Sequence, residues 1–202
     1  MGGLLALLCA AWLLEGGTSA RAVERQTLHG HVPPAVRHLR ALGRLASTNR
    51  LNVVIVLPLR NREALASLLG QLYDPASRDY HQYLTPGQFA ERFGPTPQDY
   101  EAVIAFARAN GLRVTGTHPN RTLVDVSGAA GEIEKTFQVK LHVYPHPTEG
   151  RTCYAPDVEP SLDLAVPVLT VSGLDNFAVP RPASRPAFYF RKISEAMPNV
   201  EP

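Results

Sequence analysis

The chain has 202 residues, of which 45% are hydrophobic, enough for one domain with a buried core and short tails. Its formal net charge is +2, and its basic residues are spread along the chain rather than gathered in one block. This distribution does not indicate nucleic acid or an anionic membrane surface as a partner, since both select clustered Lys and Arg.

The first 22 residues have the pattern of a secretory signal peptide. Leu4 to Leu14 is an unbroken apolar run, shorter than the roughly 20 residues that a membrane-spanning helix needs. A stretch rich in small residues follows and ends at Ala20-Arg21-Ala22, so we expect signal peptide 1–22, with cleavage after Ala22 or, alternatively, after Ala20. We therefore expect a secreted or periplasmic protein with no membrane attachment after cleavage. Cys9 leaves with the signal, so we expect Cys153 to be a buried apolar residue rather than part of a disulfide.

Residues 23–50 are polar, contain Arg and His, and show little periodicity. We expect a loosely attached N-terminal lead-in with a helical turn around Val36 to Leu45. His29-Gly30-His31 would be half of a metal site, but no Cys, Asp or Glu cluster stands beside it at ligand spacing. The pattern therefore favours a solvated tail over a metal site.

One strand and three helical pieces are predicted for the first half of the domain. Leu51 to Leu57 is rich in β-branched residues and is bounded by Pro58, as expected of a short buried strand. Asn61 is the predicted N-cap of the next helix, whose apolar positions recur at helical spacing. A helix that starts at Thr96-Pro97 and stops at Asn110-Gly111 completes a predicted crossover of three helical pieces.

The second half alternates apolar and polar residues in the manner of strands. Residues 112–117 and 121–127 form a predicted hairpin around the turn His118-Pro119-Asn120. A short helix over 128–137 and a strand over 139–144 follow, and Gly150 to Ala155 can return against that strand. The inward positions of the hairpin are Leu112, Val114, Val124 and Val126.

The predicted order of elements is therefore β-α-β-β-α-β. It is the order of the α+β, ferredoxin-like split β-α-β fold, an antiparallel sheet with helices on one face. The other face of such a sheet is either solvated or covered by a partner.

Residues 67–94 hold an unusual density of aromatic and turn-forming residues, and we expect the rest of the chain to pack around them. Asp74-Pro75 ends a helix there, because a residue before proline is forced out of the α conformation. Thr85-Pro86-Gly87-Gln88 is a capping box with proline at the first helical position. The three tyrosines of this stretch are expected to pin the loop onto the core with their rings. The motif residues are Tyr73, Asp74, Pro75, Tyr80, His81, Tyr83, Leu84, Thr85, Pro86, Phe89, Phe93 and Gly94.

The run YDPASRDYHQYLTPGQFAERFGP, which starts at Tyr73, resembles the signature of the activation domain, or propeptide, of sedolisin-family serine-carboxyl peptidases, the kumamolisin and tripeptidyl-peptidase group. The likeness extends from about Asn61 to Asn176 and includes the closing segment SGLDN at Ser172 to Asn176. We therefore assign residues 51–176 to a pro-kumamolisin-like activation domain. The resemblance implies a propeptide that assists folding of a peptidase and keeps it inactive until acid-triggered cleavage. Its implied partner is the peptidase catalytic domain, in cis or in trans, docked on the open sheet face.

No catalytic, cofactor-binding or metal-binding residues are predicted in this chain, and we expect it not to be an enzyme by itself. Ser127-Gly128 and Ser172-Gly173 are strand-end turns, outside the strand-to-helix context that exposes a nucleophilic serine. His142 and His146 lie in a predicted strand with Pro145 between them and have no third ligand. The resemblance places the catalytic residues and the calcium ligands of the family in a downstream domain.

From Phe177 the composition shifts to Pro and Arg, which is typical of an extended linker. The resemblance implies that this segment, residues 177–202, crosses toward the active-site cleft and is cut on maturation. The predicted cleft-facing residues are Arg181, Arg185, Phe188 and Tyr189.

Acid release requires groups that change charge between neutral and acidic pH, as histidine does. His81, in the central motif, is the candidate pH switch. The alternative is a structural role in which His81 satisfies hydrogen bonds of the loop.

Two other functions are left open. One is that the chain is a truncated fragment of a secreted serine-type endo- or tripeptidyl-peptidase precursor. The other is a free-standing secreted protein-binding module that has reused the fold, because a fold does not determine a function.

Overall fold

The computed structural model describes residues 25–179, so the predicted signal peptide and most of the predicted linker lie outside the described residues. Its helices are α1 (Arg62–Tyr73), α2 (Pro86–Phe93), α3 (Pro97–Ala109), α4 (Ala130–Phe137) and the 3-10 helix η1 (Pro34–His38). Its strands are β1 (Gln26–Thr27), β2 (Gly43–Arg44), β3 (Arg50–Val56), β4 (Arg113–Thr117), β5 (Leu123–Ala129), β6 (Leu141–Pro145), β7 (Thr152–Pro156), β8 (Ser161–Leu162) and β9 (Thr170–Ser172).

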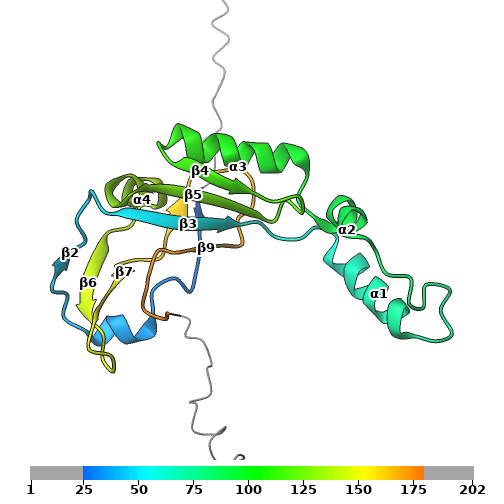
Figure 1. Ribbon diagram of the computed structural model, residues 1–202, viewed down its shortest axis with the longest axis horizontal. Coiled ribbons are helices and arrows are strands. Elements are labelled where there is room, and N and C mark those ends of the chain that lie inside the picture. Colours follow the sequence, from blue (N-terminus) through cyan, green and yellow to red (C-terminus); the bar gives the residue numbers. More distant parts are fainter. Residues whose placement is uncertain (1–24, 180–202) are drawn as a thin grey trace, which may run out of the picture.

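The main sheet has four antiparallel strands in the order β4-β5-β3-β9 (Figure 1). α3 and α4 pack on one side of it, and the largest hydrophobic cluster lies between these layers. Val53 and Ile55 of β3 point into this cluster, with Val126 and Val124 of β5 directly opposite them. The α+β class, the order of elements and the inward positions of the hairpin are thereby confirmed.

A second antiparallel sheet has the order β2-β6-β7. In a ferredoxin-like sheet the strand β6 would lie beside β3, but β9 takes that place, with Val171 opposite Ile55. β6 pairs instead with β2 and with β7, the predicted return strand. Val168, Val171 and Leu174 bring buried apolar side chains to this edge of the main sheet, which explains why the closing segment occupies it.

The N-terminal segment is part of the fold rather than a loose lead-in. β1 pairs with β8, Leu28 is buried in the main core, and Val36 of η1 is buried beside Cys153 and Ala155. The prediction of a loosely attached segment is therefore wrong, whereas a helical turn is present over Pro34–His38. Strands of two residues carry no periodicity, so the sequence pattern gave no sign of them. Cys153 is a free, buried cysteine, as predicted.

α1 and α2 form a hairpin that extends away from the main sheet (Figure 1), and we call residues 62–93 the arm. The arm has its own cluster of buried residues, Leu68, Leu72 and Phe93. The three predicted helical pieces do form the crossover between β3 and β4, but only α3 contributes to the main core. The prediction that the rest of the chain packs around the motif is wrong, because the motif lies in the arm, whose buried cluster is separate from the main core.

Two arginines join the arm to the rest of the domain through backbone carbonyls at the C-terminal end of α2. Arg121 donates from Nε to the carbonyl oxygen of Pro95 at 2.8 Å and from Nη2 to that of Ala90 at 3.0 Å. Arg60 donates from Nε to the carbonyl oxygen of Gly94. This end of a helix carries the negative end of its dipole, so both cations are favoured there.

The predicted ends of the arm helices are confirmed, with one difference in mechanism. Thr85 Oγ1 accepts the N–H of Gln88, and Gln88 Oε1 accepts the N–H of Thr85, which is the predicted capping box. Asn61 precedes α1 but does not cap it with its side chain: its φ is 51°, and its Nδ2 donates to the carbonyl oxygen of Arg92. Asn61 therefore joins the two helices of the arm to each other.

Replacement of Thr85 by alanine tests the capping box. Thr85→Ala is expected to lower the free energy of unfolding by about 1 kcal/mol, because α2 loses the side-chain acceptor of its first turn. Denaturation followed by far-UV circular dichroism measures the loss. Thr148→Ala is the matched control, since Thr148 is exposed and outside every helix, and should change stability by less than about 0.5 kcal/mol. Equal losses in the two variants would contradict the capping role.

Gly173 follows β9 with a φ of 95°, and a Cβ atom there would overlap the carbonyl oxygen of Asn52. Gly173→Ala should therefore reduce the free energy of unfolding by about 2 kcal/mol or more in a denaturant titration. Gly150→Ala is the matched control, because a Cβ at Gly150 meets no neighbouring atom, and should stay within about 0.5 kcal/mol of the unaltered chain. A Gly173→Ala chain as stable as the control would show that this conformation is not required.

Candidate docking surface

The side of the main sheet opposite α3 and α4 is not covered by any α-helix of the described residues. Asn52, Val54 and Val56 of β3 alternate with the buried positions and point to this side. Val54 and Val56 are half-buried, whereas Val53 and Ile55 on the other side are buried. The arm and the second sheet extend from opposite ends of the main sheet, with this side between them (Figure 1).

We call this side the open face. Strand register places the neighbours of the β3 residues on the same side. The residues of the open face are Asn52, Val54, Val56, Leu123, Asp125, Ser127, Thr170 and Ser172, of which Ser127 is buried.

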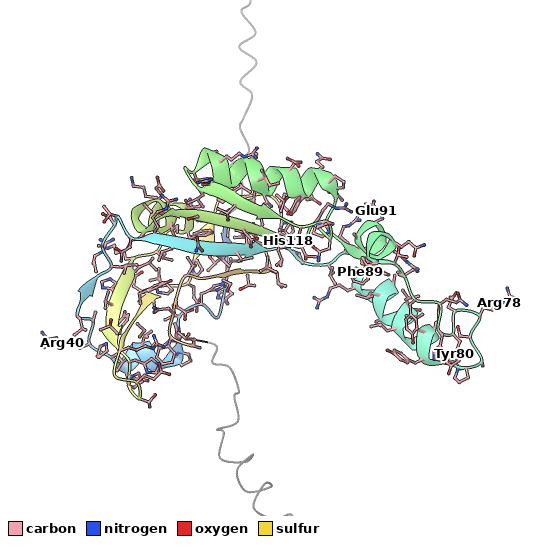
Figure 2. All side chains as sticks on the ribbon, in the orientation of Figure 1. Arg40, Arg78, Tyr80, Phe89, Glu91 and His118 are labelled. Carbon is pink, nitrogen blue, oxygen red and sulfur yellow. The ribbon has the colours of Figure 1, made fainter. Side chains whose placement is uncertain are left out.

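Hydrogen bonds within the chain fix the polar groups at the β4–β5 end of the open face. His118 Nε2 lies 3.0 Å from Asp125 Oδ2, and Figure 2 labels His118 at this place. Tyr100 of α3 donates its hydroxyl to the carbonyl oxygen of Leu123 at 2.7 Å and accepts the N–H of His118 at 2.9 Å. Burial raises the pKa of Tyr100, so its hydroxyl stays protonated as the donor. The β4–β5 turn is therefore held to α3.

The open face does not bring together the parts of a serine hydrolase. A catalytic serine needs a base within hydrogen-bond reach and donors for an oxyanion. His118 is paired with Asp125, but the hydroxyl of Ser127 accepts a hydrogen bond from Arg50 Nη2 at 3.4 Å instead of contacting that histidine. Ser127 is therefore not paired with His118 as a nucleophile would be with its base.

The three tyrosines of the central motif lie on the arm and are exposed. Tyr73 is 69% exposed, Tyr83 62% and Tyr80 37%, so the prediction that they pin the loop onto the core is wrong. The rings of Tyr80 and His81 stack with centroids 3.8 Å apart, and Figure 2 labels Tyr80 at the tip. His81 has a φ of 56° and donates its backbone N–H to the carbonyl oxygen of Leu72 at 3.1 Å, so it also orders the loop.

The remaining motif residues build the arm. Phe93 is fully buried, and its ring centroid lies 5.3 Å from that of Phe89. Leu84 packs against the same cluster. A Cβ at Gly94 would overlap the carbonyl oxygens of Ala90 and Asn120, so α2 can pass close to the main domain only with glycine there. The others set helix ends, namely Asp74 and Pro75 after α1 and Thr85 and Pro86 at the start of α2.

The closing segment Ser172 to Asn176 ties the end of the described chain to the second sheet. Arg151 donates to the carbonyl oxygens of Asn176 at 2.9 Å and Phe177 at 2.6 Å. Tyr154 donates its backbone N–H to Asn176 Oδ1 at 2.6 Å and its hydroxyl to the carbonyl oxygen of Gly173 at 3.2 Å. The position at which the predicted linker begins is therefore fixed. The predicted cleft-facing residues Arg181, Arg185, Phe188 and Tyr189 lie outside the described residues.

Gln26 anchors the N-terminal segment, which the sequence pattern had assigned to a solvated tail. Its Nε2 donates to the carbonyl oxygens of Leu164 at 2.7 Å and Val166 at 2.8 Å, and its Oε1 accepts the N–H of Val168 at 2.9 Å. These partners lie 138 to 142 positions away in the chain, so no local periodicity could indicate them.

His31 is a second anchor, and its burial corrects its assignment to a solvated tail. Its Nε2 accepts the N–H of Val171 at 3.1 Å and lies 3.0 Å from Thr170 Oγ1, while its Nδ1 lies 3.8 Å from Glu159 Oε2. Burial lowers the pKa of His31, with Glu159 and Asp175 acting in the opposite direction. Thr170, His31 and Glu159 contact one another in the order of a hydroxyl–histidine–carboxylate catalytic triad. Nε2 of His31 cannot serve as the base of such a triad, because it already accepts the N–H of Val171.

Among residues 25–179, no group of three or more His, Cys, Asp and Glu side chains is placed to hold a metal ion. No helix in that range has both the length and the apolar character that crossing a bilayer requires. His146 has another role, since its Nδ1 accepts the N–H of Glu149 at 3.1 Å and its ring lies 4.7 Å from that of Phe177. It orders the β6–β7 loop beside the closing segment.

Comparison with known proteins places this arrangement in a family. The family described as Pro-kumamolisin, activation domain, matches residues 37–177. Xanthomonalisin of Xanthomonas sp. (strain T-22) is 34% identical over 69% of this chain and 17% of its own length. Sedolisin of Pseudomonas sp. (strain 101) is 31% identical over 65% and 22%, and kumamolisin of Bacillus sp. (strain MN-32) is 26% identical over 85% and 30%. This chain thus spans less than a third of each relative's length, and it belongs to the pro-kumamolisin activation domain family.

Proposed function

We propose that this chain is a propeptide that docks on the catalytic domain of a sedolisin-type serine-carboxyl peptidase, assists its folding and keeps it inactive until acid-triggered cleavage. The observation that carries this proposal is the family match over residues 37–177. The open face supplies the surface for docking, because a sheet with helices on one side only leaves its second side for solvent or a partner.

The chemistry of the open face suits a protein partner. Half-buried Val54 and Val56 lie on its inner strand, and Asp125 and Ser172 flank Val54 on the two neighbouring strands. An apolar centre with a polar rim is the usual arrangement of protein interfaces. The arm and the second sheet, at the two ends of this face, add surface toward the roughly 800 Å² per partner that a stable interface buries.

Inhibition also needs a segment that blocks the catalytic cleft, and we assign this role to the linker. The hydrogen bonds from Arg151 to the carbonyl oxygens of Asn176 and Phe177 fix the start of the predicted linker, residues 177–202. A tethered segment has an effective concentration of about millimolar near its target, so it can block a cleft with little affinity of its own. The residues proposed to face the cleft are Arg181, Arg185, Phe188 and Tyr189.

Docking is tested with the full chain and a sedolisin-type catalytic domain produced without its own propeptide. The chain should inhibit peptide hydrolysis, and Val54→Lys should raise the inhibition constant about tenfold or more, because docking would bury the new charge. Val158→Lys is the matched control, at a side chain that is 50% exposed and outside the main sheet, and should leave the inhibition constant unchanged. Circular dichroism checks that both variants are folded.

Two results would contradict the proposal in different ways. A chain that neither inhibits the catalytic domain nor assists its refolding would not be a propeptide for it. Inhibition that Val54→Lys leaves intact would exclude docking through the open face. A partner other than a peptidase, captured from culture medium and identified, would favour a free-standing binding module.

Acid release through His81 stays a prediction. His81 is exposed and stacked on Tyr80, so its protonation weakens docking only if the partner covers the ring. His81→Gln should then move release from the catalytic domain to lower pH, measured as binding across a pH series, while His38→Gln, at another exposed histidine, should not. An unchanged release pH would remove His81 from the mechanism.

A further inference from the structure

One edge of the main sheet is closed by a histidine from the N-terminal segment. β9 is an edge strand, and the backbone N–H of Val171 donates to His31 Nε2 at 3.1 Å rather than to another strand. Thr170 Oγ1 lies 3.0 Å from the same nitrogen. His31 is only 8% exposed, so water does not readily replace it there. The side chain therefore joins two segments that are 140 positions apart in the chain.

The hydrogen bond from Val171 determines the protonation state of the ring. A nitrogen that accepts an N–H carries no proton, so His31 is neutral while this bond exists, and its proton is on Nδ1. Nδ1 is buried without a hydrogen-bond partner, 3.8 Å from Glu159 Oε2.

We propose that the hydrogen bond of His31 holds the N-terminal segment to β9 at neutral pH. Protonation of His31 on acidification breaks this bond and weakens the attachment of the N-terminal segment and of β9 to the fold. When Nε2 gains a proton, it becomes a donor that faces the N–H donor of Val171, and their hydrogen bond is lost. The loosened edge lies just before the closing segment from which the linker departs. That protonation of His31 contributes to the acid release of a peptidase rests on the proposed function. The weakened attachment of the N-terminal segment and β9 does not depend on that function.

The groups around the ring act in opposite directions. Glu159 and Asp175 favour the protonated ring, as do the backbone groups of His29 and Leu28. The hydroxyl of Thr170 can also accept a hydrogen bond from a protonated Nε2. Burial acts against protonation and is the largest influence, so the pKa of His31 lies below its ordinary value of about 6.5. The folded chain then binds fewer protons than the unfolded chain below that pH, and stability is lost as pH falls from there through the folded pKa.

Glu159 adds a second response at lower pH. Its carboxylate accepts the N–H of His31 at 2.9 Å. Burial alone would raise the pKa of Glu159, but hydrogen bonds from the backbone of residues 30–32 outweigh it and hold the pKa below its ordinary value. The stabilisation by Glu159 is present at neutral pH and is lost as pH falls through this lowered pKa. The loss of stability due to His31 therefore begins below about pH 6.5, its ordinary pKa, and the loss due to Glu159 begins only below its own ordinary pKa of about 4.5.

The test compares melting temperatures of the full chain, His31→Gln and His29→Gln at about pH 7.5 and about pH 5. Gln offers Oε1 to the Val171 N–H but cannot gain a proton, and His29, two residues away, is exposed. The fall in melting temperature between the two pH values should be about 3 °C smaller in His31→Gln than in the unaltered chain. His29→Gln should behave as the unaltered chain does. Equal falls in all three would overturn the proposal.

Hydrogen exchange of the unaltered chain decides the question if His31→Gln does not fold. After correction for the intrinsic pH dependence, protection of residues 26–31 and 161–172 should fall about tenfold more than protection of α3 over the same pH range. A uniform change would overturn the proposal. Neither measurement uses a peptidase, so failure here leaves the proposed function standing, and a chain that inhibits no peptidase can still show this acid response.

Discussion

The pairing of β3 with strands on both of its sides is the interaction on which the rest of the structure depends. β3 pairs with β5 from Arg50 to Val56 and with β9 from Val54 to Val56. Its alternation places Val53 and Ile55 in the core under α3 and α4, and the residues between them on the open face. One strand therefore determines the core, the open face and the position of the closing segment.

The arm depends less on this core than its sequence suggested. Its buried cluster is separate from the main one, and it joins the domain through Arg60, Arg121 and close passage at Gly94. A small separate cluster opens more readily than a large one, so the arm is expected to be the less stable unit. The stretch with the clearest family signature thus builds a projecting element, and its tyrosines remain available at the surface.

Local signals were sufficient for most elements of the fold. The β-branched run that became β3, the capping box at Thr85 and the turn at His118 each rest on neighbours a few residues away, and all three were predicted correctly. The strand at the edge of the main sheet was not predicted correctly. Apolar and polar residues alternate in both β6 and β9, and burial of Val171 and Leu174 against residues distant in the chain places β9 at this edge. Long-range packing of this kind leaves no mark on local periodicity.

The same reasoning explains what was missed at the candidate sites. His81 is the predicted pH switch because it lies in a dense motif, but the structure exposes it at the tip of the arm. His31 lies in a segment without periodicity, and only the folded structure brings it to β9. An aromatic residue at the end of a helix, such as Tyr73, or in a loop, such as Tyr83, gives no local sign of its burial, so the sequence did not distinguish exposed from buried tyrosines.

Both edges of the main sheet are poor templates for a foreign strand. At β9, the N–H of Val171 is already taken by a side chain. At β4, the register shifts between Val114 and Gly116, and such a bulge interrupts the regular row of donors and acceptors that intermolecular pairing requires. We therefore expect the sheet to resist edge-to-edge aggregation even when its open face is uncovered.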